Sequence, residues 1–237
     1  DLHPEQIEDI AASVRLLTAE LGGTPLIGFA GAPFTLASYL IEGGPSRNHE
    51  RTKAMMAGEP ELFSRLLDKL ARISETFLRV QREAGAAMYQ LFDSWAGYLD
   101  ERSYRRHVQG HSATIIAGLA DLERPSSHFG VQTGELLTAM SEIGTDVVGV
   151  DFRVDLADAS ARVQEHQALQ GNLDPALLFA PWPAVRARIA EILAAGARHS
   201  ESRGGGAHIF NLGHGVLPVT DPPMLTRLVE YGPERTR

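Results

Sequence analysis

Short apolar runs alternate with longer amphipathic stretches along almost the whole chain. Residues 25–31, PLIGFAG, carry no charge and are bounded by proline and glycine, whereas residues 61–85 place apolar side chains three and four positions apart. The first pattern predicts a buried strand and the second an amphipathic helix. Applied throughout, the same criteria predict six strands, over 25–31, 86–94, 126–132, 146–152, 168–173 and 207–213.

Helices are predicted before, between and after these strands. Their expected ranges are 5–21, 34–41, 61–85, 103–122, 134–143, 157–164, 183–199 and 222–229. Two glycine-rich stretches, 42–50 and 200–208, are predicted to be loops. Strands that alternate with helices favour a parallel sheet, either open and doubly wound or closed into a (β/α) barrel.

The ends of the predicted strands favour the barrel. No strand is followed by the G-x-G-x-x-G pattern of dinucleotide-binding sheets. Polar residues and glycines gather where nearly every strand ends, and in a barrel these ends converge on one mouth. We therefore expect a single α/β domain of the (β/α)8 TIM-barrel type over residues 1–237, with about six of the eight βα units present and the N-terminal part incomplete.

Composition narrows the classes of function. The 237 residues include no cysteine, which excludes disulfides, thiolate nucleophiles and cysteine-containing metal sites. A net charge of −8 does not suit binding to nucleic acid or to an anionic membrane. The uncharged run 21–41 approaches the length of a membrane span, but prolines and glycines divide it. The acidic, polar start does not resemble a signal peptide, and we expect a soluble cytoplasmic protein.

Candidate site residues lie at the strand ends and in the helix and loop that follow the first strand. His214 stands between two glycines in NLGHG; it is either a cleft residue or a loop histidine with ordinary hydrogen bonds, and the glycines are expected to allow a sharp turn. Asp93 and Ser94 end the second strand and should point to opposite sides, with Phe92 on the side of Ser94. Tyr39 is either a ligand donor or a packed tyrosine. Arg47 lies in the 42–50 loop, which is either an anion-binding lid or an exposed connection.

A metal site is not expected. The nine histidines include no H-E-x-x-H pair. His107 and His111 are four residues apart on a predicted helix, a spacing that suits a ligand pair, but solvated or capping roles explain them better.

Six motifs in this order resemble the bacterial uroporphyrinogen decarboxylase family. They are GFAGAPFTLASYLIEGG, QLFDSWAGYL, HFGVQTGELL, DVVGVDFRV, LQGNLDP and IFNLGHGVLP, and they cover about Pro25 to Val229. Each motif is weak by itself, whereas six in register are specific.

The resemblance implies a fold, an activity and a set of site residues. It implies a (β/α)8 barrel that forms a homodimer and converts uroporphyrinogen III to coproporphyrinogen III with release of four CO2, without metal or organic cofactor. Tyr39, Ser94 and His214 match the family's substrate-contacting tyrosine, serine and histidine, and Phe92 would form apolar wall. Arg47 is a candidate contact for an acid group of the substrate.

Two of the family's elements have no counterpart in this sequence. These are the arginine segment of the form R-Q-A-G-R and the aspartate that faces the pyrrole nitrogens; neither Asp93 nor Asp151 lies in a matching motif. The missing elements would supply the first two strands, so this chain is expected to be an inactive fragment that lacks the principal acid–base groups.

Three other interpretations remain open. The first is a corrinoid or thiol methyltransferase of the related barrel superfamily, although such enzymes typically hold zinc with cysteine. The second is a non-catalytic porphyrin-binding remnant, and the third is a (β/α) domain with an unknown ligand.

Overall fold

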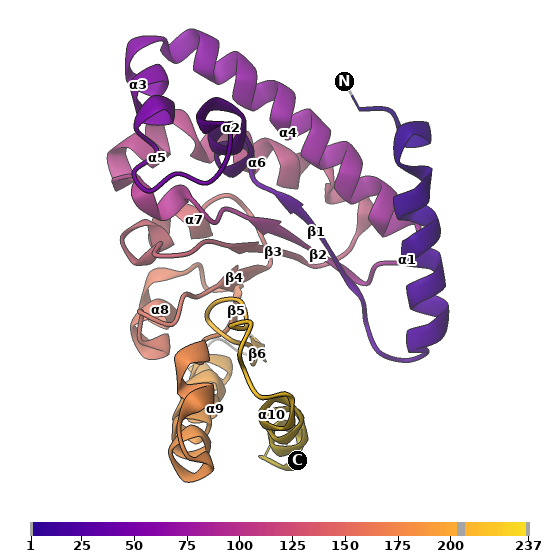
Figure 1. Cartoon of the computed structure of the whole chain (residues 1–237), viewed down its shortest axis with the longest axis vertical. Coiled ribbons are helices and arrows are strands. Elements are labelled where there is room, and N and C mark those ends of the chain that lie inside the picture. The colour runs from indigo at the N-terminus through magenta and orange to yellow at the C-terminus, as the bar shows by residue number, and fades with distance from the viewer. Residues whose placement is uncertain (1, 203–206, 236–237) are drawn as a thin grey trace. The chain divides into compact units, whose positions relative to one another are not determined.

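The computed structural model describes residues 2–202 and 207–235 (Figure 1). The chain divides into two compact units, Asp1–Val148 and Gly149–Arg237, and each is described by itself. The single-domain interpretation of residues 1–237 stays a prediction.

The first unit is built on three neighbouring strands, β1 (Ile27–Gly31), β2 (Met88–Phe92) and β3 (Ser126–Phe129). They are hydrogen-bonded in that order and both pairs are parallel, with Gly31 opposite Phe92 and Phe92 opposite Phe129. Along β1 the buried Gly28 and Ala30 alternate with the more exposed Ile27 and Phe29, as expected where the two faces of a strand have different surroundings.

Helices cover the face of these strands to which Ala30 points. The helices of this unit and its single-turn 3-10 segments are η1 (Pro4–Ile7), α1 (Glu8–Leu21), α2 (Pro33–Glu42), α3 (Glu50–Gly58), α4 (Pro60–Glu83), η2 (Ala96–Tyr98), α5 (Glu101–His107), α6 (Gln109–Gly118), η3 (Ala120–Leu122), η4 (Gly134–Leu136) and α7 (Leu137–Ser141). The long α4 runs across β1 and β2 (Figure 1). Ala30 packs there against Ala71 and Leu78 of α4.

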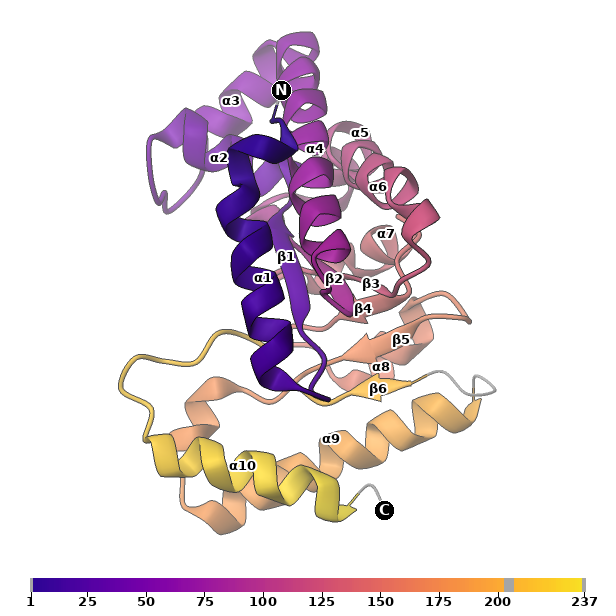
Figure 2. The same ribbon diagram turned by 90° about the vertical axis from the view of Figure 1, so that its right-hand side faces the viewer.

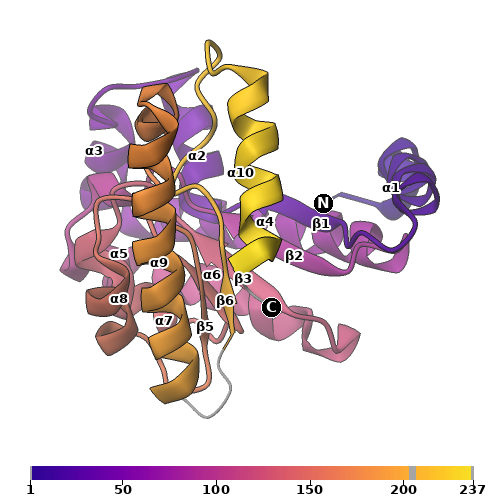
Figure 3. The ribbon, with the colours of Figure 1, turned by 90° about the horizontal axis from the view of Figure 1, so that it is seen from below.

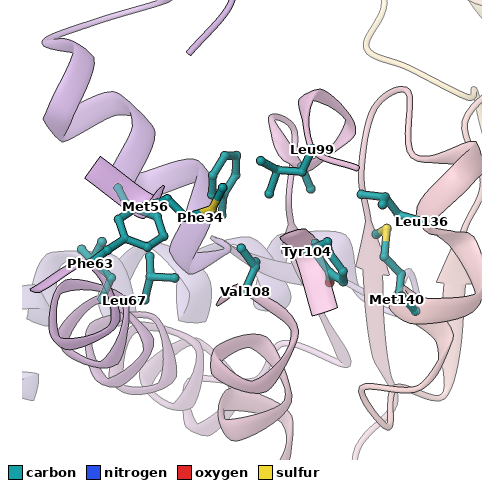
Figure 4. Close-up of a cluster of buried hydrophobic side chains, with 13 residues drawn as sticks. Phe34, Met56, Phe63, Leu67, Leu99, Tyr104, Val108, Leu136 and Met140 are labelled. Atoms are coloured by element: carbon teal, nitrogen blue, oxygen red, sulfur yellow. The ribbon is translucent and has the colours of Figure 1, made fainter. Parts of the chain in front are cut away.

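A hydrophobic cluster of buried side chains lies among α2, α3, α4, α5 and α7 (Figure 4). Phe34, Phe63 and Leu67 are fully buried in it, and Tyr104 and Met140 join them. A smaller cluster fixes α1, whose Ala11 and Val14 pack against the end of α4, and the two helices lie side by side in Figure 2.

Among its described residues, the second unit holds two further strands and three α-helices. Their bounds are β5 (Ala168–Gln170), β6 (His208–Ile209), α8 (Leu156–Arg162), α9 (Trp182–Ser202) and α10 (Pro222–Arg235), with the 3-10 segment η5 (Pro175–Phe179). The strands β5 and β6 pair in parallel. Helices α9 and α10 lie side by side (Figure 3), and the rings of Trp182 and Tyr231 meet edge to face at 5.7 Å. Strand β4 (Val147–Gly149) crosses the boundary between the units.

All six predicted strands are confirmed, each within its expected range. The predicted helix over 103–122 is wrong as a single element, because buried Val108 leaves helical geometry and α5 and α6 are separate. Helix α3 was not predicted, since of its nine residues only Thr52 and Met56 are buried and the apolar pattern is weak. The predicted loop 200–208 begins as the last turn of α9, and its residues 203–206 lie outside the described part of the chain.

Candidate functional site

The end of β2 is tied to the start of α2 by a buried carboxylate. Asp93 is 0% exposed, and its carboxylate accepts a hydrogen bond of 2.9 Å from the hydroxyl of Thr35 on α2. The same hydroxyl oxygen accepts from the backbone N–H of Trp95 at 3.2 Å, and the Asp93 N–H donates to the carbonyl of Phe129 at 2.7 Å. This network fixes the loop that carries Ser94 against both α2 and β3.

Other polar groups surround Asp93 in the interior. The Nε2 atom of His128 lies 3.8 Å from a carboxylate oxygen of Asp93, and both side chains are fully buried. Neither ring nitrogen of His128 has a hydrogen-bond partner among the described residues. Burial raises the pKa of Tyr104 well above its usual value, and the nearby Asp93 raises it further. Asp93 is thus buried, whereas Ser94 is half-buried, and the prediction that only one of the two faces the site stays a prediction.

Replacing Asp93 by alanine is expected to lower the free energy of unfolding by about 2 kcal/mol, because the Thr35 hydroxyl loses its buried acceptor. Asp93→Asn keeps an oxygen that can accept from Thr35 and should cost clearly less. Urea unfolding followed by tryptophan fluorescence measures both. Equal losses for the two variants would show that the hydrogen bond to Thr35 contributes nothing.

An aromatic row lines the opposite face of the strands. The rings of Phe29 and Phe92 meet edge to face at 5.7 Å, and those of Phe92 and Phe129 at 6.1 Å. Phe29 is 58% exposed, an unusual position for a strand phenylalanine. Sequence reasoning selected Phe92 and missed Phe29, although the alternation of small and large residues in IGFAG places Phe29 away from Ala30.

Trp95 connects Tyr39 to the segment that carries Ser94. Tyr39 is 44% exposed on α2, whereas Phe34 of the same helix is fully buried, as expected from their five-residue separation. The Tyr39 ring contacts the ring of Trp95 at 5.7 Å, and Trp95 adjoins the half-buried Ser94. The Tyr39 ring thus lies against the residue that follows Ser94, and the joint role of Tyr39 and Ser94 stays a prediction.

The loop between α2 and α3 spans residues 43–49, as predicted, and Arg47 is exposed within it. Helix α2 ends at Gly43, whose left-handed φ of 79° lets its N–H donate to the carbonyl of Tyr39 at 3.0 Å. Arg47 thus follows directly from the helix that carries Tyr39.

His214 lies in the second unit, and its placement relative to the residues above is not described. The side chain is exposed, and Nδ1 accepts from the N–H of Gly215. The chain bends at Gly213 and His214, as predicted, but neither glycine has a left-handed φ. Gly213 is required for another reason: a Cβ there would lie 2.4 Å from the backbone nitrogen of Phe152. Gly215 faces open space.

The second unit also holds an ion pair at the end of β4. A guanidinium nitrogen of Arg153 lies 2.8 Å from the carboxylate of Asp151, and the guanidinium stacks 4.1 Å from the ring centre of Phe152. Arg153 was not among the predicted site residues, although it directly follows the predicted strand 146–152.

The histidine pair considered as metal ligands is not assembled. His107 ends α5, while His111 lies on α6, where its Nδ1 is 2.8 Å from Asp68. Over residues 2–202 and 207–235, no group of three or more histidine, aspartate or glutamate side chains could hold a metal ion. Within the same ranges, no helix is both long and apolar enough to cross a membrane.

Comparison with known proteins places these motifs in a family. Residues 1–234 match the family model described as Uroporphyrinogen decarboxylase (URO-D). The chain belongs to the uroporphyrinogen decarboxylase family. It is 59% identical over 225 residues to the uroporphyrinogen decarboxylase of Salinispora tropica, covering 95% of this chain and 59% of that protein. It is also 59% identical over 236 residues to that of Streptomyces griseus, covering 100% of this chain and 63% of the relative. The chain therefore spans about three fifths of the length of these decarboxylases.

The fold is shared with a more distant protein. A methyltransferase from Methanosarcina mazei aligns with a TM-score of 0.81 at 17% identity, over 98% of this chain and 65% of that one. At this identity the likeness shows the fold alone: an α/β fold of the barrel type, present here in part, with six parallel strands. The predicted fold class and family are thus confirmed.

Proposed function

We propose that this chain is part of a cofactor-independent uroporphyrinogen decarboxylase, which converts uroporphyrinogen to coproporphyrinogen in heme biosynthesis. The family match over residues 1–234 carries the proposal. The complete protein would act in the cytoplasm as a homodimer. Within this chain, the surface formed by Tyr39, Phe92 and Ser94 would bind the substrate, with Phe29 as an added contact.

The chemistry of these side chains suits such a substrate. A tetrapyrrole combines large apolar rings with eight carboxylates, so it needs an apolar wall bordered by hydrogen-bond donors and cations. The exposed ring of Phe29, edge to face with Phe92, offers the apolar wall. The hydroxyls of Tyr39 and Ser94 can donate to carboxylates, and Arg47 can form charge-assisted hydrogen bonds to them. His214, in the second unit, stays a predicted substrate contact.

Decarboxylation of an acetate group needs more than binding. A proton adds to a ring carbon of the pyrrole and leaves positive charge on the ring; the bond to the carboxylate then breaks, CO2 departs, and its electron pair neutralises the ring. A second proton then adds to the exocyclic methylene carbon to form the methyl group, and the ring carbon loses the proton that it first gained, which restores the neutral aromatic pyrrole. A carboxylate near the pyrrole nitrogens would stabilise the cation.

We do not assign that carboxylate to either buried aspartate of this chain. Asp93 accepts from Thr35 inside the wall, and Asp151 is paired with Arg153. The sequence also has no R-Q-A-G-R segment. We therefore propose that these 237 residues bind the tetrapyrrole without turning it over.

Binding and turnover are measured separately. Uroporphyrin III, the oxidised and fluorescent form, is titrated into this chain, and we expect saturable binding. Tyr39→Phe and Ser94→Ala should each weaken binding by about fivefold, the loss of one hydrogen bond. Arg47→Ala should weaken it by about threefold, as for an exposed charge contact. Arg65→Ala, an exposed arginine of α4, is the control and should bind normally.

Turnover is measured under anaerobic conditions with uroporphyrinogen III, and the products are separated by chromatography. We expect no coproporphyrinogen from this chain, while a full-length relative assayed in parallel produces it. Turnover near that of the relative would contradict the assigned inactivity. Absence of uroporphyrin binding would contradict the assigned site.

A further inference from the structure

His49 has contacts that the proposed binding surface does not explain. It precedes α3, is 1% exposed and has a left-handed backbone with φ of 52°. Such a conformation is uncommon for residues other than glycine, although histidine is among those enriched in it. A buried polar side chain held in this conformation suggests that the position has a specific role.

Two hydrogen bonds connect His49 to helix α2 and to the middle of the 43–49 loop. Its Nδ1 atom lies 2.5 Å from the hydroxyl oxygen of Ser38 on α2, and both groups are buried. Its backbone N–H donates to the hydroxyl of Ser46 at 3.0 Å. The loop that carries Arg47 is therefore closed onto the helix that carries Tyr39.

Ring contacts connect His49 to the loop after β2. The imidazole lies 4.9 Å from the ring of Trp95 and 4.5 Å from that of Tyr98, measured between ring centres. The Nζ atom of Lys53 lies over the Tyr98 ring, 5.9 Å from its centre. The contacts with Trp95 and Tyr98, together with the hydrogen bond to Ser38, hold the imidazole in one orientation.

Three of the partners of His49 are next to a residue of the proposed binding surface. Ser38 precedes Tyr39, Ser46 precedes Arg47 and Trp95 follows Ser94. We propose that His49 is a positioning residue, which holds the Arg47 loop at the same end of the first unit as Tyr39 and Ser94. The identity of the ligand rests on the proposed function, whereas the ordering of the loop does not.

The neutral imidazole is the form that suits this position. Burial lowers the pKa of His49, and Lys53 acts in the same direction, while Glu42 and Glu50 oppose them. Because the folded pKa lies below the ordinary value near 6.5, the unfolded chain binds more protons than the folded chain as pH falls through that value. The contribution of His49 to stability is thus present at neutral pH and is lost on acidification.

The spectroscopic test uses Trp95 as a reporter. The chain has two tryptophans, so Trp182→Phe leaves Trp95 as the sole one. In this background we expect Trp95 emission to change with a midpoint below pH 6.5, as the imidazole beside it gains a proton. His49→Asn, which tolerates a left-handed backbone, should abolish the transition and increase hydrogen exchange of amides 43–49. Asn48→Ala, exposed in the same loop, is the matched control and should alter neither.

Uroporphyrin binding provides the second measurement. His49→Asn should weaken binding at least as much as Arg47→Ala does, and the double variant should bind no more weakly than His49→Asn alone, because the loop is already released. Ser38→Ala should also weaken uroporphyrin binding and increase hydrogen exchange of amides 43–49, in each case by less than His49→Asn does. Independent, additive effects of the two substitutions, or unchanged exchange in His49→Asn, would overturn the proposal. If the unmodified chain binds no uroporphyrin, the proposed function fails, and the fluorescence and exchange results still decide the role of His49.

Discussion

Replacing Phe63 by alanine is expected to lower the free energy of unfolding by about 4 kcal/mol, the largest loss that we predict for a core residue. Phe63 is 0% exposed in the cluster that joins α2, α3, α4, α5 and α7. Figure 4 shows its ring beside Met56 and Leu67. Alanine would therefore leave a cavity, because the tightly packed side chains of the neighbouring helices cannot move far enough to fill it. The loss combines transfer of the ring from an apolar site with the cost of that cavity.

Leu62 offers a matched control on the same helix. Its side chain is 41% exposed, and Leu62→Ala should cost less than about 1 kcal/mol because little buried area is lost. Urea unfolding of both variants in the Trp182→Phe background, followed by Trp95 fluorescence, gives the two free energies. Similar losses at the two positions would mean that α4 does not bury the face that carries Phe63.

The second large effect is expected at Gly97. A Cβ at this position would lie 2.2 Å from the carbonyl oxygen of Val131 and 2.7 Å from that of Gln132. Both atoms belong to the backbone, so no rotation of a side chain can relieve the contact. We expect Gly97→Ala to lower the free energy of unfolding by about 3 kcal/mol, the upper end of the usual cost of overpacking.

The same substitution should also disturb the site, because Gly97 stands between Trp95 and Tyr98, the two rings that contact His49. Gly110→Ala is the control: it lies in α6 with open space around it, and alanine there should leave stability unchanged or raise it by up to about 1 kcal/mol. Thermal and urea unfolding measure stability, and near-ultraviolet circular dichroism reports the Trp95 environment. A stable Gly97→Ala variant with an unchanged Trp95 signal would contradict the close approach of the two loops.

Prediction from sequence succeeded where one local pattern sufficed. The apolar run ending in GFAG predicted β1, and the regular spacing of Phe63 and Leu67 predicted α4. It failed where the outcome depended on distant contacts. Val108 ends α5 because it packs into the core, and α3 has too few buried residues to show a periodic pattern. The reason for Gly213 was also out of reach, since the Phe152 backbone that crowds it is far away in the sequence.

The sequence by itself determined the alternation of strands and helices, the family motifs and the selection of Tyr39, Phe92 and Ser94. These follow from residue type and short spacing. Only the tertiary structure decided that Asp93 is buried beneath Thr35, that Phe29 is exposed beside Phe92, and that His49 joins three segments. The physical reason is that burial and hydrogen bonding depend on which segments meet, and Ser38, His49 and Trp95 come from elements that the chain brings together only by folding.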